Sequence, residues 1–357
     1  MTKTFKNCWT GILAITLLVA VVPAMAGAQS IEVQPPFHLT VFAKAVANQF
    51  TQPDSIAVGK DRIFIGFGNG VAKDGTDGKS STIVEYRMNG SMVRTFSVVG
   101  HNDGLKIDPR TQLLWALQNE DGNPALTIIN TRTGAQQNFT FAPTAHGGGY
   151  DDMVFRNGEV FLSASNPSGN PNTAPAVVRA TLSGSSVLVS PVFAGNATAT
   201  DVITETPVTL NLQDPDSMIL TPGGDVILDS QSDQELVIIR HIGAANQSAV
   251  RVPISSPLGS TEVDDTIFAT SSEGFILFSD LNAGIIYKLQ RSHFSPGSAF
   301  SAADIPGFVG RIDLEFGELI PIVTGLQNPR GMAFVATRDD DEDSRRGQER
   351  GCEVSDR

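Results

Sequence analysis

An acidic residue recurs at the start of a short apolar run along this chain of 357 residues. The five acids are Asp54, Asp103, Asp151, Asp216 and Asp265, and a sixth run begins with the base Arg330. Carboxylates that are brought together repel one another, which raises their pKa values or recruits a cation. A hard ion such as Ca²⁺ takes six to eight oxygen ligands, so a ring of these acids could bind it. In a competing structural interpretation, each Asp accepts hydrogen bonds from its own loop, and the repeat copies this cap.

The spacing of these acids indicates which elements position them. They recur at intervals of 49, 48, 65 and 49 residues, and Arg330 follows after another 65. Each one opens the phrase acid–x–apolar–x–apolar, which is followed by a turn and a second apolar strand. Periods near 40–50 residues with several strands per unit are typical of β-propeller blades. We therefore expect an all-β fold, a six-bladed β-propeller of four-stranded antiparallel blades. A seventh blade could be contained in the two longer intervals.

Two further expectations concern the strand order. The runs Phe275–Ser279 and Ile285–Leu289 follow Asp265 in the same order as the second and third strands of the earlier repeats, so we expect them in the blade of Asp265. The run His38–Phe42 is an outer strand with no blade before it, and the run at Arg330 is an inner strand with no blade after it. Pairing these two in one blade would remove both open edges and close the ring.

The two ends of the chain differ from its body. Lys3 and Lys6 precede an apolar run at 11–22 and small residues at 23–28, which predicts a signal peptide over residues 1–28. The apolar run is too short for a stable membrane span, so we expect an exported protein, periplasmic or extracellular. A single propeller domain should occupy 31–337. Residues 338–357 are rich in charge and contain no apolar run, which predicts a disordered tail.

Charge and composition exclude some classes of function. The formal net charge of −13 and the pI of about 4.8 argue against a nucleic-acid partner, because phosphate binding requires clustered bases. Only His101 and His146 lie near ring acids in the sequence, and zinc usually requires three protein ligands. We therefore expect both histidines, with Arg330, near the mouth of the central channel of the propeller, and not as ligands of a zinc ion.

Three phrases resemble inner strands of six-bladed NHL-type propellers, which include the regucalcin/gluconolactonase and strictosidine-synthase-like groups. These phrases are Asn328–Phe334, Asp214–Met218 and His101–Leu105. The resemblance covers roughly residues 37–336 and implies a divalent ion at the channel mouth, held by Glu, Asn and Asp side chains. By this resemblance Asp216 and Asp265 match the Asp of that pattern, and Asp103 stands where the family often has Asn. The family's Glu has no clear match here, since Asp54 is shorter.

Two functional hypotheses follow from these patterns. The first is an exported binding or scaffold module that recognises an unknown protein or small-molecule ligand through an acidic loop face. The alternative is a divalent-metal-dependent lactonase, or a related small-molecule hydrolase, that uses the Asp ring. No complete catalytic constellation is visible, so no catalytic residue is assigned and Ca²⁺ is the only cofactor considered. Retention of a divalent ion by the purified protein would favour the hydrolase.

Overall fold

A computed structural model describes residues 30–337, and within this range the chain forms β-strands and no helix. The expected signal peptide over 1–28 and the expected tail over 338–357 lie outside the described residues. Among the described residues, no helix is long and apolar enough to cross a membrane.

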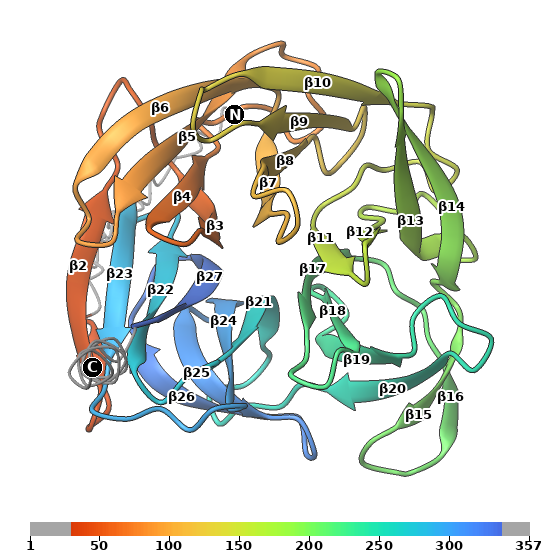
Figure 1. Ribbon diagram of the computed structural model, residues 1–357. Helices are drawn as coiled ribbons and strands as arrows, with labels where there is room; N and C mark the ends of the chain where they lie inside the picture. Colours follow the sequence, from red (N-terminus) through yellow and green to blue (C-terminus); the bar gives the residue numbers. More distant parts are fainter. Residues whose placement is uncertain (1–29, 338–357) are drawn as a thin grey trace, which may run out of the picture. The chain divides into compact units, whose positions relative to one another are not determined.

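Twenty-four of the described strands pair in six antiparallel groups of four (Figure 1). Each group is given from its inner to its outer strand. The first group contains β3 (Pro53–Val58), β4 (Arg62–Phe67), β5 (Ser80–Arg87) and β6 (Met92–Val99), and the second contains β7 (Asn102–Ile107), β8 (Leu114–Gln118), β9 (Ala125–Ile129) and β10 (Gln136–Phe141). The third contains β11 (Met153–Arg156), β12 (Glu159–Ser163), β13 (Pro175–Ser183) and β14 (Ser186–Ala194). The fourth group contains β17 (Pro215–Leu220), β18 (Val226–Ser230), β19 (Glu235–Arg240) and β20 (Ser248–Pro253), and the fifth contains β21 (Glu262–Phe268), β24 (Ala299–Ile305), β25 (Phe308–Asp313) and β26 (Glu318–Thr324). The sixth contains β27 (Pro329–Ala336), β22 (Gly274–Asp280), β23 (Ile285–Gln290) and β2 (His38–Lys44).

Three short strands extend these groups at their outer edges. Strand β1 (Glu32–Val33) pairs with β26, and a hairpin of β15 (Thr198–Asp201) and β16 (Pro207–Thr209) joins the outer strand β20. The outer strands β10 and β14 pair in parallel, so the second and third groups form one continuous sheet. These additions leave the inner strands unchanged.

The inner strands form a closed ring. Each of β3, β7, β11, β17 and β21 contacts the next inner strand, and β27 contacts β3. The N-terminal strand β2 completes the group of β27, the last strand, as predicted from the two unpaired runs at His38 and Arg330. The expected all-β propeller class, closed by the N-terminal strand, is therefore confirmed.

The strand order between β21 and β27 corrects one expectation. The runs 275–279 and 285–289 lie in β22 and β23, which pair with β27 and β2, whereas β21 pairs with β24. The expected assignment to the blade of Asp265 is therefore wrong. Two neighbouring inner strands offer the same kind of edge to an apolar strand, and the sequence period does not say which edge it takes. A Cβ on Gly274 would lie 2.5 Å from the Val335 carbonyl oxygen, so glycine lets β22 start close against β27.

Six clusters of buried apolar side chains fill the spaces between neighbouring groups. The cluster between the last and first groups packs Phe275 and Val335 against Ile65 and Phe67, so the closure of the ring is itself a hydrophobic interface. Strand β8 is buried along its whole length. Strands that are covered on both faces need such continuous apolar runs, which explains their appearance in the sequence.

Neighbouring inner strands approach most closely where glycine stands. A Cβ on Gly104 would collide with the carbonyl oxygen of Asp151, and a Cβ on Gly331 would collide with that of Asp54. Both obstacles are backbone atoms of the next inner strand, which cannot move without displacing a whole group.

We expect Gly104→Ala to lower the free energy of unfolding by about 1–3 kcal/mol, the usual cost of overpacking a filled space. Denaturant unfolding of the two proteins measures this difference. Gly223→Ala is the matched control, because its Cβ would make only an ordinary 3.7 Å contact with the Thr221 hydroxyl. Equal losses in both variants would contradict the close approach of the inner strands.

Candidate functional site

The acids at the start of the inner strands converge on one small cavity. Its volume is about 20 Å³, enough for one water molecule or ion. Carboxylates from five different inner strands or their entry loops line it, namely Asp54, Asp103, Asp151, Asp216 and Asp264. Arg330 occupies the sixth position, on β27, and bonds to Asp264. We call these six the ring residues.

Asp264, rather than the predicted Asp265, occupies the ring position of β21. The residue after each ring residue faces the next inner strand: Ser55 donates a hydrogen bond to the Asp103 carbonyl, and Ser217 donates one of 2.5 Å to the Asp264 carbonyl. Asp265 holds this following position, because its carboxylate accepts a hydrogen bond from the Met332 amide on β27. The register shift after Val263 matches the shifts after Pro53, Asn102 and Pro215, which sets Asp264 level with Asp54, Asp103 and Asp216. The sequence pattern missed this because Thr266 stands where those strands have Ile56, Leu105 and Met218.

Among the acids that line the cavity, Asp152 and Asp265 accept hydrogen bonds from backbone amides. Asp152 follows the ring residue Asp151 and accepts a 3.0 Å hydrogen bond from the Met218 amide on β17. It also pairs with Lys106, whose Nζ lies 2.8 Å from its Oδ2. The predicted capping role therefore applies to the following position and joins neighbouring strands. In contrast, the side chains of Asp54, Asp103, Asp151 and Asp216 accept no hydrogen bond from a backbone N–H anywhere in residues 30–337.

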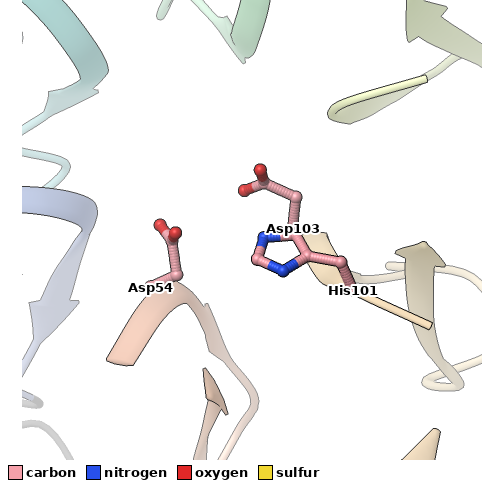
Figure 2. A group of neighbouring side chains, drawn as sticks. All are labelled: Asp54, His101 and Asp103. Carbon is pink, nitrogen blue, oxygen red and sulfur yellow. The ribbon is translucent and has the colours of Figure 1, made fainter. Parts of the chain in front are cut away.

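Two overlapping sets of donor atoms lie among the ring residues. Asp54, His101 and Asp103 each offer one donor atom within 4.8 Å of the others, and so do Asp103, Glu120 and Asp151. Figure 2 shows that the first three side chains point into the same space, Asp54 from the β3 side and the other two from the start of β7. Asp103 belongs to both sets, which together contain four carboxylates and one imidazole.

Glu120 was missing from the candidates that the sequence indicated. It lies in the loop between β8 and β9, is only 3% exposed, and its Oε2 has no hydrogen-bond partner among the described residues. Its Oε1 forms an ion pair with Lys73, whose side chain is 51% exposed. A buried carboxylate oxygen without a partner is costly, and a cation would satisfy it. The signal in the sequence was the acidic run 119–121 at the tip of the second loop.

His101 presents a neutral imidazole to the same region. Its Nδ1 lies 3.2 Å from the carbonyl oxygen of Val71, and a carbonyl can only accept, so Nδ1 carries the proton. Burial lowers the pKa of His101, and this leaves Nε2 with a free lone pair at neutral pH. Metal-bound histidines usually donate their other N–H in this way.

His146 does not join this group. Its Nε2 donates a 2.7 Å hydrogen bond to the carbonyl oxygen of Gly149, and its ring packs on Tyr150. These contacts lie within its own loop. The sequence placed both histidines near the mouth, and the structure brings only His101 to a donor set.

Asp151 and Asp216 form a carboxyl pair on the third and fourth groups. Burial, reinforced by the charge of Glu120, raises the pKa of Asp151 well above its ordinary value. Burial and the charge of Asp151 do the same to the pKa of Asp216. The two side chains hydrogen-bond to each other, so without a cation they share a proton.

Arg330 neutralises the opposite part of the ring. Its guanidinium lies 2.9 Å from Asp264 Oδ1 and 3.4 Å from Asp304 Oδ2, and its side chain is 16% exposed. Burial raises the pKa of Asp264 to about 7, although the charge of Arg330 opposes this rise. Burial likewise raises the pKa of Asp54 to about 8, again opposed by Arg330. In the two donor sets, the direct ion pair among the described residues is that of Lys73 with Glu120.

Asp229 on β18 is a buried acid away from the donor sets. Its Oδ2 accepts a hydrogen bond from the Thr266 hydroxyl at 2.9 Å and lies 3.2 Å from the Ser217 hydroxyl, whose proton goes to the Asp264 carbonyl, while Oδ1 has no partner among the described residues. Burial raises its pKa well above the ordinary value, helped by the charge of Asp265. The folded protein therefore favours the neutral acid.

We expect Asp229→Asn to stabilise the protein at pH 8 and to leave it unchanged at pH 4. A raised folded-state pKa means that the acid's contribution is complete below the unfolded pKa near 4 and is lost as the pH rises. Asn mimics the neutral acid at every pH, so the gap between the two melting temperatures should widen from pH 4 to pH 8. A constant gap would show that Asp229 ionises freely in the folded state.

Comparisons with known proteins find only distant similarities of structure. In sequence comparisons, no family model and no curated protein matches the chain. Among solved structures, a streptogramin B lyase is 9% identical and covers 85% of this chain and 74% of its own, with a TM-score of 0.45. A protein of unknown function from Bacteroides caccae is 10% identical, with 82% and 89% covered and a TM-score of 0.48. A putative gluconolactonase is also 10% identical, with 82% and 83% covered and a TM-score of 0.45. These similarities are distant, and the propeller class rests on the strand pairing of the chain itself.

The donor set fits a divalent cation. Four carboxylates supply hard oxygen ligands, and one neutral imidazole supplies a nitrogen. Glu120 Oε2 is the buried carboxylate oxygen of these donor sets that has no hydrogen-bond partner among the described residues. Asp54, Asp103, Glu120, Asp151 and His101 are the residues that would hold such an ion.

Proposed function

We propose that the chain is an exported, divalent-metal-dependent hydrolase of small carbonyl compounds, with its centre at the channel mouth. One observation carries this proposal: two donor sets share Asp103, and one of them contains the buried, unpartnered Oε2 of Glu120. The lactone or ester class follows from the resemblance of the inner-strand phrases to gluconolactonase-like propellers.

The chain's own residues supply the remaining chemistry. A divalent cation in this position would polarise a carbonyl oxygen or lower the pKa of water. Asp264, with a pKa of about 7, is suited to take up and return a proton at neutral pH. Arg330 and Gln231 both donate to its Oδ1, which leaves Oδ2 as the oxygen that exchanges the proton. Arg330 thereby orients the base.

The test combines metal analysis with turnover. Purified protein is dialysed and its metal content measured, and hydrolysis of γ-lactones, δ-lactones and 4-nitrophenyl acetate is followed with a chelator and after return of Ca²⁺, Mn²⁺ or Zn²⁺. We expect about one divalent ion per chain and turnover that the chelator abolishes. Glu120→Gln should lose both, whereas Glu315→Gln, an exposed glutamate on the β25–β26 turn, should keep both.

Other outcomes reject the proposal in distinct ways. A retained ion without turnover on any substrate would reject the hydrolase and leave a cation-binding propeller. Neither ion nor turnover would favour the scaffold hypothesis, which predicts recognition by the acidic face alone.

A further inference from the structure

A second cavity, of about 340 Å³, lies at the other end of the inner strands from the acidic mouth. The mouth is formed where these strands begin, and the second cavity is formed where they end. All six inner strands line it, through the segments 56–58, 106–107, 153–155, 218–220, 267–268 and 332–334. A concave space of this size is typical of a small-molecule site.

The wall of this cavity is apolar. Half-buried side chains form its rim, among them Val58, Ile107, Phe155, Leu220 and Phe334. Beneath the rim lie three methionines from three different strands, Met153, Met218 and Met332. Methionine is flexible and polarizable, and therefore adapts to apolar ligands of different shape.

Lys106 supplies the one charged group among the described residues that line this cavity. It also lines the small acidic cavity, so it stands between the two ends of the inner strands. One contact of its ammonium is with Asp152, whose Oδ2 is 2.8 Å from Nζ. An ammonium has three donors, so others remain for a ligand above it.

The charges around Lys106 determine which kind of polar group a ligand could place against its ammonium. Asp152 contacts the ammonium, and Asp265 lies close enough to act on it electrostatically. These carboxylates already balance the ammonium, so an anionic head would meet net repulsion. A cationic head would meet the ammonium directly. A neutral acceptor such as a carbonyl or hydroxyl oxygen avoids both kinds of repulsion.

We propose that this second cavity binds a small neutral amphipathic molecule, with the apolar body of the molecule against the rim and its oxygen accepting a hydrogen bond from the Lys106 ammonium. None of the residues proposed to bind the cation lines this cavity. The inference therefore stands or fails independently of the hydrolase proposal.

Calorimetric titration of the full chain with eight-carbon probes tests this inference. We expect 2-octanone to bind at one saturable site, and octanoate and octyltrimethylammonium to bind at least about tenfold more weakly. Equal affinities for the three probes, or no saturable binding of 2-octanone, would overturn it. This comparison uses the unaltered protein and does not depend on the folding of a variant.

Two variants locate the site. Ile107→Trp fills the rim and should weaken 2-octanone binding by at least about tenfold, whereas Val99→Trp, on the exposed outer strand β6, should leave it unchanged. The double variant Lys106→Met/Asp152→Asn removes the donor and its partner together, and should weaken 2-octanone binding by about tenfold through the lost hydrogen bond. Unchanged binding in Ile107→Trp would overturn the proposal. Binding that appears only after removal of residues 338–357 would also overturn it, because the chain's own tail would then be the occupant.

Discussion

Replacement of Arg330 by methionine is expected to lower the free energy of unfolding by about 3–5 kcal/mol at pH 7, the usual cost of removing one partner of a buried ion pair. The guanidinium contacts Asp264 and Asp304, and its charge also acts on Asp54 and Asp216. Without it, several buried carboxyls of the ring have no neutralising partner. Denaturant unfolding at pH 7 measures the loss.

The pH dependence of this loss separates charge from packing. Removal of Arg330 leaves the carboxyl of Asp264 without the charge that opposes its rising pKa. The penalty should therefore be smaller at pH 5, where this carboxyl is neutral, than at pH 8, where it must ionise or take up a proton. Arg311→Met is the control, since Arg311 is exposed on β25 and forms no ion pair with a described residue. A loss in Arg330→Met that is independent of pH would show that the side chain acts by packing alone.

Asp103→Asn is expected to abolish the thermal stabilisation of the protein by a divalent cation. A ligand at 100 times its Kd stabilises the folded state by about 2.7 kcal/mol, which corresponds to a rise in Tm of roughly 5 °C for a domain of this size. Asp103 contributes to both donor sets, so its loss removes a ligand that no neighbour replaces. Melting curves of the wild type and the variant, with Ca²⁺ and with a chelator, measure this effect.

Asp216→Asn and Asp265→Asn are the matched controls for this experiment. The sequence pattern predicted that both would share the cation, but neither belongs to a donor set in the structure. Asp216 pairs with Asp151, and Asp265 caps the Met332 amide. Both variants should therefore retain the shift with Ca²⁺. A wild-type melting temperature that is indifferent to Ca²⁺, Mn²⁺, Zn²⁺ and chelator would retire the cation site.

Repetition is what made the fold predictable from the sequence. Runs such as Ile63–Phe67 and Leu113–Leu117 recur with their turns, and strands buried on both faces must be continuously apolar. The unpaired runs at the two ends of the series predicted closure by the strand at His38, because an open edge is costly. The convergence of the ring residues also follows from repetition, since equivalent positions in a closed ring face the same axis.

Details of pairing were not predictable in the same way. Asp264 lies in the ring although the apolar pattern points to Asp265, because Thr266 takes the place of the first apolar residue of the run. Strand β22 pairs with β27 rather than β21, and a period does not tell which of two similar edges a strand meets. Only the packed structure distinguishes between them.

By itself, then, the sequence determined an all-β closed ring whose inner strands begin with acids, because hydrophobic period and turn residues act locally and repeat. The tertiary structure decided which acids act together. It brings Glu120 from a loop and His101 from a strand entry beside Asp54, Asp103 and Asp151, and pairs Asp264 with Arg330. It also places Lys106 between an acidic mouth and an apolar cavity. These relations join residues from different groups, whose distances depend on how the six groups pack rather than on any spacing along the chain.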